Sequence, residues 1–369
     1  MPDFLRATID VLLGIGLLFG GGELFVQGSV ALALVFGIPQ LVIGLTVVSL
    51  GTSAPELFVS LSSVFRGSDA LAVSNAVGSN IFNVMVVLGA SALVLPLRVE
   101  SRLVRRDIPL LIAISAAVWG MASAGRMTWQ AGVALLVGLM INTVWEIRTA
   151  REQPDVSVDA EPEVDANAGR GGWTLAVIKL IAGIAVLTIG SRVLVSGAIT
   201  AATLLGVSEA VIGLTIVSAG TSTPELITSM VAALRGRTDL AIGNVVGSCL
   251  LNLTLVLGGG ALAAGSRGLI VSADLIHDDL PVMLLTSLAC LPIFWTKGVI
   301  SRVEGGLLLG LYLLYVIDNI LPRTSMASWA DEFRLVMLCL VIPAVMVIIV
   351  TQALIYWKGG SESQQRLVK

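Results

Sequence analysis

The chain has 369 residues, of which 56% are hydrophobic and 13% are charged, and its mean hydropathy is +0.95. Soluble globular domains carry charge on about 25% of their residues. This composition therefore excludes an ordinary soluble protein and indicates an integral membrane protein. The formal net charge of −3 limits the function little, because the charged residues gather between the apolar segments.

Apolar segments long enough to cross a bilayer as helices, which takes about 20 residues each, occur along the whole chain. We therefore expect an all-α, polytopic helical membrane protein with about 11 transmembrane helices. No small-residue cleavage site precedes the first span, so no removable signal peptide is predicted. The predicted spans are residues 9–33, 38–65, 70–96, 107–124, 127–148, 173–203, 209–234, 238–264, 279–297, 301–321 and 333–356.

Basic residues are distributed unequally between the two sides of the membrane. The loops opposite the N-terminus carry most of them, among them Arg98, Arg102, Arg105 and Arg106. The positive-inside rule places these loops in the cytoplasm. We expect the N-terminus outside the cell and the central linker and the C-terminus inside it.

An internal repeat relates the two halves of the chain. Glu56 and Glu225 lie 169 residues apart, and about half of the positions in 37–89 match those in 206–258 without a gap. Each copy holds five spans, which is an odd number, so the second copy must enter the membrane from the opposite face. The predicted organisation is a first repeat in 1–148, an acidic cytoplasmic linker in 149–172, a second repeat in 173–321, and an extra C-terminal helix with its tail in 322–369.

Other residues carry local structural predictions. Asp107 and Asp279 each precede an x-Pro pair, which predicts helix starts with Asp as the N-cap. His277, the only histidine, is expected in the loop before the second of these helices. Glu23 and Arg192 are related by the repeat offset, which predicts an ion pair between the first and sixth spans. The three thiols are predicted to be buried and structural, namely Cys249, Cys290 and Cys339.

Two matching motifs place a carboxylate inside the membrane. They are GTSAPE, ending at Glu56, and GTSTPE, ending at Glu225. A charge at this depth costs at least about 2.5 to 3.5 kcal/mol and indicates a functional site, most simply an ion ligand or a proton carrier. The proline before each glutamate has no N–H, so the carbonyls of Gly51 and Gly220 are expected to be free to bind a cation at a helix break.

Oxygen-bearing side chains accompany both acids. Two hydroxyls share a helical face with each glutamate, and the third and eighth spans add VGSNIFN and VGSCLLN, in which Ser and Asn are i, i+4 neighbours. An all-oxygen set without imidazole or thiolate is typical of a hard cation such as calcium, and it also suits sodium. Ser60 and Ser229 are instead expected only to contact neighbouring helices. The candidate ligands are Glu56, Glu225, Asn83, Asn252, Thr52, Ser53, Ser79, Thr221, Ser222 and Ser248.

These paired motifs resemble the alpha-repeats of the calcium/cation antiporter superfamily and are closest in form to prokaryotic sodium/calcium exchangers. The resemblance extends over spans one to ten. It implies two inverted five-helix repeats, with spans two, three, seven and eight around the site and spans one and six as a sliding pair. It also implies a plasma-membrane antiporter of a bacterium or archaeon that carries calcium and sodium ions, is not an enzyme, uses no cofactor and binds no nucleic acid.

The resemblance also implies roles for single residues. Glu56 and Glu225 become the central calcium ligands. The hydroxyl ligands for sodium become Ser53, Ser79, Ser222, Ser248, Thr52 and Thr221, with backbone carbonyls near Ser49 and Ser218.

The sequence departs from this family in two places. Asn252 stands where many sodium/calcium exchangers have an acid, which is similar to proton/calcium relatives. Both copies keep GTS-PE, however, whereas the proton branch usually opens with a GN-type motif, so we expect sodium drive with proton exchange as the alternative. The eleventh span lies outside the repeat and is expected to pack at the periphery.

Two other classes are disfavoured. A cation channel fits less well than an antiporter, because a deep charged site suits stepwise alternating access better than rapid conduction. An intramembrane protease would need a Ser-His or paired-Asp arrangement at depth, which these spans lack.

Overall fold

The computed structural model describes residues 2–152, 172–204, 218–295, 298–323 and 327–341, with a few separate positions beyond Val341. Most of the predicted linker, the start of the predicted span 209–234 and most of the predicted span 333–356 lie outside these residues. Within the described residues the chain is helical apart from turns and two short β-ribbons.

The elements of the first half include three π-helical turns, labelled η. They are α1 (Pro2–Phe36), α2 (Gln40–Ile43), η1 (Gly44–Val48), α3 (Ser49–Thr52), α4 (Ala54–Phe65), α5 (Asp69–Phe82), η2 (Asn83–Val87), α6 (Leu88–Val94), β1 (Leu97–Arg98), η3 (Leu103–Asp107), α7 (Ile108–Ala122), β2 (Arg126–Met127) and α8 (Trp129–Glu152).

The second half repeats this order. Its described elements are α9 (Gly172–Leu204), α11 (Ser218–Thr221), α12 (Thr223–Leu234), α13 (Thr238–Leu251), η5 (Asn252–Val256), α14 (Leu257–Ala264), the 3-10 turn η6 (Gly265–Arg267), β3 (Leu269–Ile270), η7 (Leu275–Asp279), α15 (Leu280–Trp295), β4 (Val299–Ile300) and α16 (Arg302–Ile320). The 3-10 turns η8 (Leu321–Arg323) and η9 (Ala327–Trp329), then α17 (Ala330–Val336) and the π-helical η10 (Met337–Val341), follow the repeat.

Apolar helices confirm the prediction of a polytopic membrane protein. Among the described residues, seven helices are long and apolar enough to cross a membrane, and the bent pair Gln40–Thr52 and Ala54–Phe65 makes an eighth. The fourth predicted span is α7 with η3, and α11 with α12 is the described part of the seventh. The all-α architecture follows from these segments, because a helix satisfies its own backbone hydrogen bonds where no water is present.

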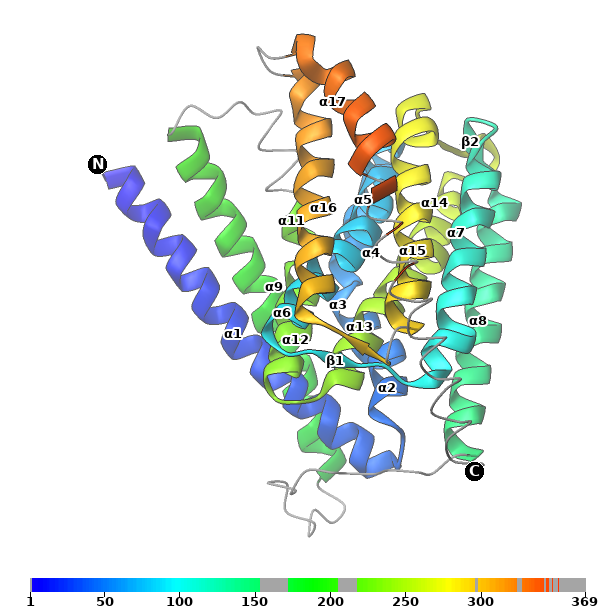
Figure 1. The fold of residues 1–369 in the computed structure, drawn as a ribbon. Coiled ribbons are helices and arrows are strands. Elements are labelled where there is room, and N and C mark those ends of the chain that lie inside the picture. Colours follow the sequence, from blue (N-terminus) through cyan, green and yellow to red (C-terminus); the bar gives the residue numbers. More distant parts are fainter. Residues whose placement is uncertain are drawn as a thin grey trace, which may run out of the picture.

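The long helices α1 and α9 form a tilted pair at one side of the bundle (Figure 1). Glycines recur every seven residues along their seam. A Cβ atom on Gly14 would lie 2.6 Å from the backbone of Leu194, and one on Gly183 would lie 2.7 Å from Phe25. Only glycine allows these backbones to approach so closely. The six seam glycines are Gly14, Gly21, Gly28, Gly183, Gly190 and Gly197.

The two β-ribbons reveal the inverted relation between the halves. Strand β1 of the first half pairs with β4 of the second, and β2 of the first pairs with β3 of the second. The two ribbons lie at opposite ends of the molecule, with β1 at the bottom and β2 at the top of Figure 1. Equivalent residues meet between the halves as well, since the hydroxyl oxygens of Ser115 and Ser287 lie 3.3 Å apart.

The predicted helix starts at Asp107 and Asp279 are wrong. Helical structure begins earlier, at Ser101 and Ala273, and both aspartates lie inside π-helical turns. His277 consequently lies in a helical turn rather than in a loop. A π-turn directly before each proline relaxes the backbone pattern that the proline would otherwise break, so the Asp-x-Pro sequence does not begin a helix here.

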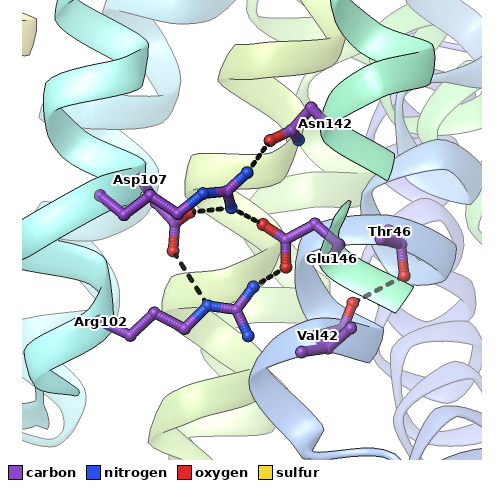
Figure 2. A network of polar contacts seen from close by, with 7 residues as sticks. Val42, Thr46, Arg102, Asp107, Asn142 and Glu146 are labelled. Atoms are coloured by element: carbon purple, nitrogen blue, oxygen red, sulfur yellow. Dashed lines mark hydrogen bonds and ion pairs between the residues drawn. The ribbon is translucent and has the colours of Figure 1, made fainter. Parts of the chain in front are cut away.

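Asp107 instead takes part in a buried ionic network (Figure 2). Its carboxylate accepts a hydrogen bond from Arg106 at 2.7 Å, and both Arg102 and Arg106 donate to the buried Glu146 of α8. The Arg106 guanidinium also lies 3.6 Å from the ring centroid of Trp145. Two positive and two negative charges thus balance at this end of the first repeat.

Two further sequence predictions are wrong. Glu23 pairs with Arg235, the residue directly after α12, at 2.7 Å, and not with Arg192. Residues related by a pseudo-twofold axis touch only where they lie on that axis, and Glu23 points away from it towards α12. Cys249 and Cys290 are buried as predicted, but Cys339 is exposed on η10.

Candidate cation site

Each intramembrane glutamate lies on the first helical turn after a break. Ser53 separates α3 from α4 with φ −83° and ψ 4°, and the two segments are bent by 45°. Ser222 separates α11 from α12 with nearly the same angles, φ −89° and ψ 7°. Glu56 and Glu225 therefore lie at the N-termini of α4 and α12, where the helix dipole favours negative charge.

Hydroxyls link the two acids across the repeats. Ser53 Oγ donates a hydrogen bond to Glu225 Oε1, and Ser222 Oγ donates one to Glu56 Oε1, both at 3.0 Å. Ser222 Oγ also lies 2.9 Å from Ser79 Oγ. The serine of each motif thus serves the acid of the other motif. From the sequence alone, each serine was expected beside the acid of its own motif, and these hydrogen bonds between the motifs were not predicted.

The second carboxylate oxygen of each acid has no partner. Glu56 and Glu225 are fully buried, and the Oε2 atom of each accepts no hydrogen bond. The amide groups of Asn83 and Asn252 are also fully buried, and neither atom of either amide is paired. Buried polar atoms in proteins are nearly always hydrogen-bonded. Unpaired oxygens from two acids and two amides therefore indicate a ligand.

Asn83 and Asn252 begin equivalent π-helical turns. Asn83 is the first residue of η2, which packs against α12, and Asn252 is the first residue of η5, which packs against α4. Each amide therefore lies on an element that contacts the helix bearing the other repeat's glutamate. Single π-turns inside α-helices are frequent at functional sites.

The threonines contact two residues that the sequence analysis missed. Thr52 Oγ1 donates to Asn244 Oδ1 at 3.1 Å, and Thr221 Oγ1 donates to Asn75 Oδ1 at 3.3 Å. Asn75 and Asn244 lie 169 residues apart, so the repeat offset could have identified them. Thr52 Oγ1 also lies 3.5 Å from Ser248 Oγ.

Each of these asparagines also forms hydrogen bonds within its own repeat. The Asn75 Nδ2 atom donates to the Glu56 backbone carbonyl at 3.2 Å and to Ser60 Oγ at 2.9 Å. Asn244 makes the equivalent bonds to the Glu225 carbonyl at 3.4 Å and to Ser229 Oγ at 2.9 Å. Ser60 and Ser229 are therefore not only helix contacts but part of the support of the site.

The predicted free carbonyls are occupied where the structure describes their contacts. The Gly220 carbonyl accepts a hydrogen bond from Ser191 Oγ at 2.5 Å, so the prediction that it is free is wrong. The Ser49 carbonyl accepts the backbone N–H of Ser53 at 2.9 Å. The helix break also places both acids at helix N-termini.

The arrangement presents two acids and several neutral oxygens in a buried setting. Within the described residues, neither Glu56 nor Glu225 forms an ion pair with a basic side chain. The described part of the chain also holds no cluster of three or more His, Cys, Asp or Glu that would suit a metal ion. Hydroxyl and amide oxygens must therefore complete any cation shell around the two acids, which is the chemistry of hard cations.

Fold and site together define a polytopic membrane protein of the cation-transporting class. The family model described as "Sodium/calcium exchanger protein" matches residues 7–147 and 175–321. The chain therefore belongs to the sodium/calcium exchanger family. It is a calcium/cation antiporter of the membrane, and its family consists of transporters and not of enzymes.

Several relatives cover nearly the whole of both chains. "Putative antiporter CaxA" of Alkalimonas amylolytica is 36% identical over 84% of this chain and 98% of its own length. "Inner membrane protein YrbG" of Escherichia coli is 33% identical over 86% and 99%, and "Sodium/calcium exchanger MaX1" of Methanosarcina acetivorans is 30% identical over 83% and 96%. Among solved structures, the sodium-calcium exchanger NCX_Mj matches with a TM-score of 0.72 at 29% identity, over 85% of this chain and 98% of that one.

Proposed function

We propose that this protein is a secondary active antiporter that exchanges calcium for sodium by alternating access at one all-oxygen site between the repeats. The observation that carries the proposal is the set of unpaired, fully buried oxygens on Glu56, Glu225, Asn83 and Asn252. Glu56 and Glu225 would bind calcium directly. Calcium takes about 6 to 8 oxygen ligands, so the two amides and nearby hydroxyls would complete its shell.

The charge of the site supports exchange rather than simple binding. Two carboxylates balance one calcium ion, and two sodium ions or two protons balance them equally well. Hydroxyl oxygens without full charge suit sodium, so Ser53, Ser222, Thr52 and Thr221 would bind sodium beside the acids. Ser79 and Ser248, which lie within 3.5 Å of these hydroxyls, would join them.

Sodium rather than protons is proposed as the driving ion. Both copies keep GTS-PE, and the relative MaX1 is named a sodium/calcium exchanger. Proton exchange is the second candidate, because Asn252 replaces an acid that many sodium-driven relatives have. A channel is disfavoured, since two buried acids would hold calcium too tightly for rapid conduction.

The proposed placement in the membrane follows the distribution of arginines. The network of Arg102 and Arg106 lies on the arginine-rich side, which the positive-inside rule places in the cytoplasm. The N-terminus would then lie outside, the linker and C-terminus inside, and residues 1–148 and 173–321 would be the two transport repeats. A prokaryotic plasma membrane is the proposed location.

Radiocalcium uptake into proteoliposomes tests this function. The purified protein is reconstituted with sodium inside, and uptake is followed after dilution into sodium-free buffer, then with a proton gradient in place of the sodium gradient. We expect uptake that needs internal sodium and saturates with calcium. Uptake that follows the pH gradient without sodium would assign proton exchange, and uptake that needs no counter-ion would assign a channel.

A further inference from the structure

The same end of each repeat can be compared residue by residue. The turn η7 lies 172 residues after η3, and β4 lies 173 residues after β2. Gly89 packs against Gly305, and Gly132 packs against Gly258, which confirms this register through contacts in both copies. Positions in η3 and α8 therefore correspond to positions in η7 and α16.

In the first repeat this end supplies its own positive charges. Arg102 and Arg106 neutralise Asp107 and Glu146 (Figure 2). The ring of Trp145 packs against Arg106. Asp107 and Glu146 are buried, so leaving either without a cation would be costly.

In the second repeat the equivalent positions lack both arginines. Asp274 and Asp278 stand where the first repeat has Arg102 and Arg106. Asp279 keeps the acid of Asp107 and accepts a hydrogen bond from Tyr315 at 2.7 Å. Acid also replaces Trp145, whose equivalent is Asp318. Four acids and no lysine or arginine thus occupy the equivalent positions of the second repeat.

A guanidinium from outside the repeat reaches this cluster. Arg334 of α17 lies 3.6 Å from Asp278 Oδ1 and 3.3 Å from Asp318 Oδ2. Arg334 and Met337 also line the wall of a cavity of ≈ 280 Å³ between α15 and α16, whose other walls include Val282, Leu308 and Leu311. Figure 1 shows α17 lying between α15 and α16 at this end of the molecule. Two ion pairs therefore join α17 to the second repeat, and η10 begins at the wall of the adjoining cavity.

We propose that α17 is a built-in docking partner of the second repeat, and that its Arg334 supplies the positive charge that the first repeat obtains from Arg106. The extra helix is then not a peripheral addition. It supplies a positive charge at one end of the second repeat, at positions where that repeat has no arginine of its own. This inference does not depend on which ions the protein transports.

Hydrogen exchange of the full-length protein in detergent tests the proposal. Arg334→Gln removes the guanidinium at a half-exposed position. We expect amides of α17 and of η7 to exchange about 3 to 10 times faster than in the wild type, because the ion pair of Arg334 with Asp278 holds α17 to η7 and its pair with Asp318 holds α17 to α16. Arg334→Lys keeps the charge and should have a smaller effect on both segments.

Adding Asp278→Arg to Arg334→Gln distinguishes completion of the repeat from simple attachment of a helix. This change gives the second repeat the arginine that the first repeat has at position 106. Exchange in η7 should return to the wild-type rate, while α17 should stay fast because its own cation is still missing. Asp3→Arg, which changes the net charge equally on another helix, serves as the control and should restore neither segment.

Three results would overturn the proposal. The first is unchanged exchange of η7 in Arg334→Gln. The second is failure of Asp278→Arg to slow η7 in the double variant. The third is an equal slowing of amide exchange in η7 by Asp3→Arg, which would show that the net charge of the protein alone causes the effect.

Discussion

The cation site and the α1–α9 pair differ in how closely the two repeats correspond. At the site the crossed bonds recur, since Ser53 donates to Glu225 as Ser222 donates to Glu56. At the α1–α9 pair the charges do not correspond. Glu23 binds Arg235, whereas its equivalent Arg192 makes no ion pair within the described residues. The crossed hydrogen bonds of the site are therefore symmetric between the repeats, whereas the charges around α1 and α9 are not.

The placement of the pair shows the same asymmetry. Both α1 and α9 pack against α12, but the described contacts include no comparable packing of either helix against α4. In an inverted repeat the opposite conformation exchanges the roles of the two copies. That exchange would bring Arg192 towards Arg66 in the way that Glu23 now lies beside Arg235. Under the proposed alternating access, two like charges would then meet, which would disfavour that opposite conformation.

Removing a charge from either acid should have the largest effect and break the symmetry of the site. Glu56→Gln and Glu225→Gln should each lower calcium exchange more than about 100-fold, because each leaves a buried divalent ion with one carboxylate. Size-exclusion chromatography of both variants controls for folding. Near-normal radiocalcium exchange by either folded variant would refute the assignment of that acid.

Removing the crossed hydroxyls should have a smaller and ion-specific effect. Ser53→Ala and Ser222→Ala should each raise the half-saturating sodium concentration about 10-fold, since each loses a neutral ligand and a bond to an acid. The half-saturating calcium concentration should change less. Ser63→Ala is the matched control, because the Ser63 hydroxyl donates to the Val59 carbonyl of its own helix. Equal losses for sodium and calcium would argue against separate ligand roles.

The asparagines missed by the sequence analysis should act through the threonines. When a cation takes a lone pair of the Thr52 hydroxyl, the hydroxyl hydrogen needs another acceptor, and Asn244 Oδ1 provides it. Asn244→Ala and Thr52→Val should each raise the half-saturating sodium concentration about 5-fold. The double variant should show no further increase. A 25-fold increase, about the product of the two single effects, would mean that the residues act independently.

The charge asymmetry around α1 and α9 should have the smallest effect. Glu23 and Arg235 have side chains that are 30% and 60% exposed, and pairs of this kind contribute about 0.2 to 1 kcal/mol. Arg192→Glu would give Arg66 the carboxylate partner that Arg235 already has. We expect Arg192→Glu to change the exchange rate about 1.5- to 5-fold. Arg192→Gln should change the rate in the same direction by about half as much. No difference between these two variants would show that Arg192 and Arg66 do not approach each other during the cycle.

The sequence predicted the repeat and the acids because both depend on local patterns. A glutamate beside a proline in an apolar span is visible without a structure, and so is the 169-residue offset. The crossing of the serines was not visible, because it depends on how the two breaks face each other. Asn75 and Asn244 are separated by the same 169-residue offset. They were not predicted as site residues because they lie outside the motifs that contain the acids and the candidate hydroxyls.

Other predictions failed because one local pattern serves two structures. Asp-x-Pro is typical of a helix start, yet Asp107 and Asp279 are each the last residue of a π-turn within a continuing helix. The offset that identifies equivalent residues also suggested that Glu23 meets Arg192. Equivalence places two residues in similar surroundings and not in contact, except on the axis, where Ser115 meets Ser287.

Equilibrium binding of radiocalcium to the purified protein tests the central claim most directly, because it needs no gradient and no transport. The account predicts one calcium ion per chain, displaced by sodium, with binding lost in both Glu56→Gln and Glu225→Gln and kept in Ser63→Ala. Full binding of one calcium ion by either glutamine variant would contradict the claim that the two crossed acids form a single site.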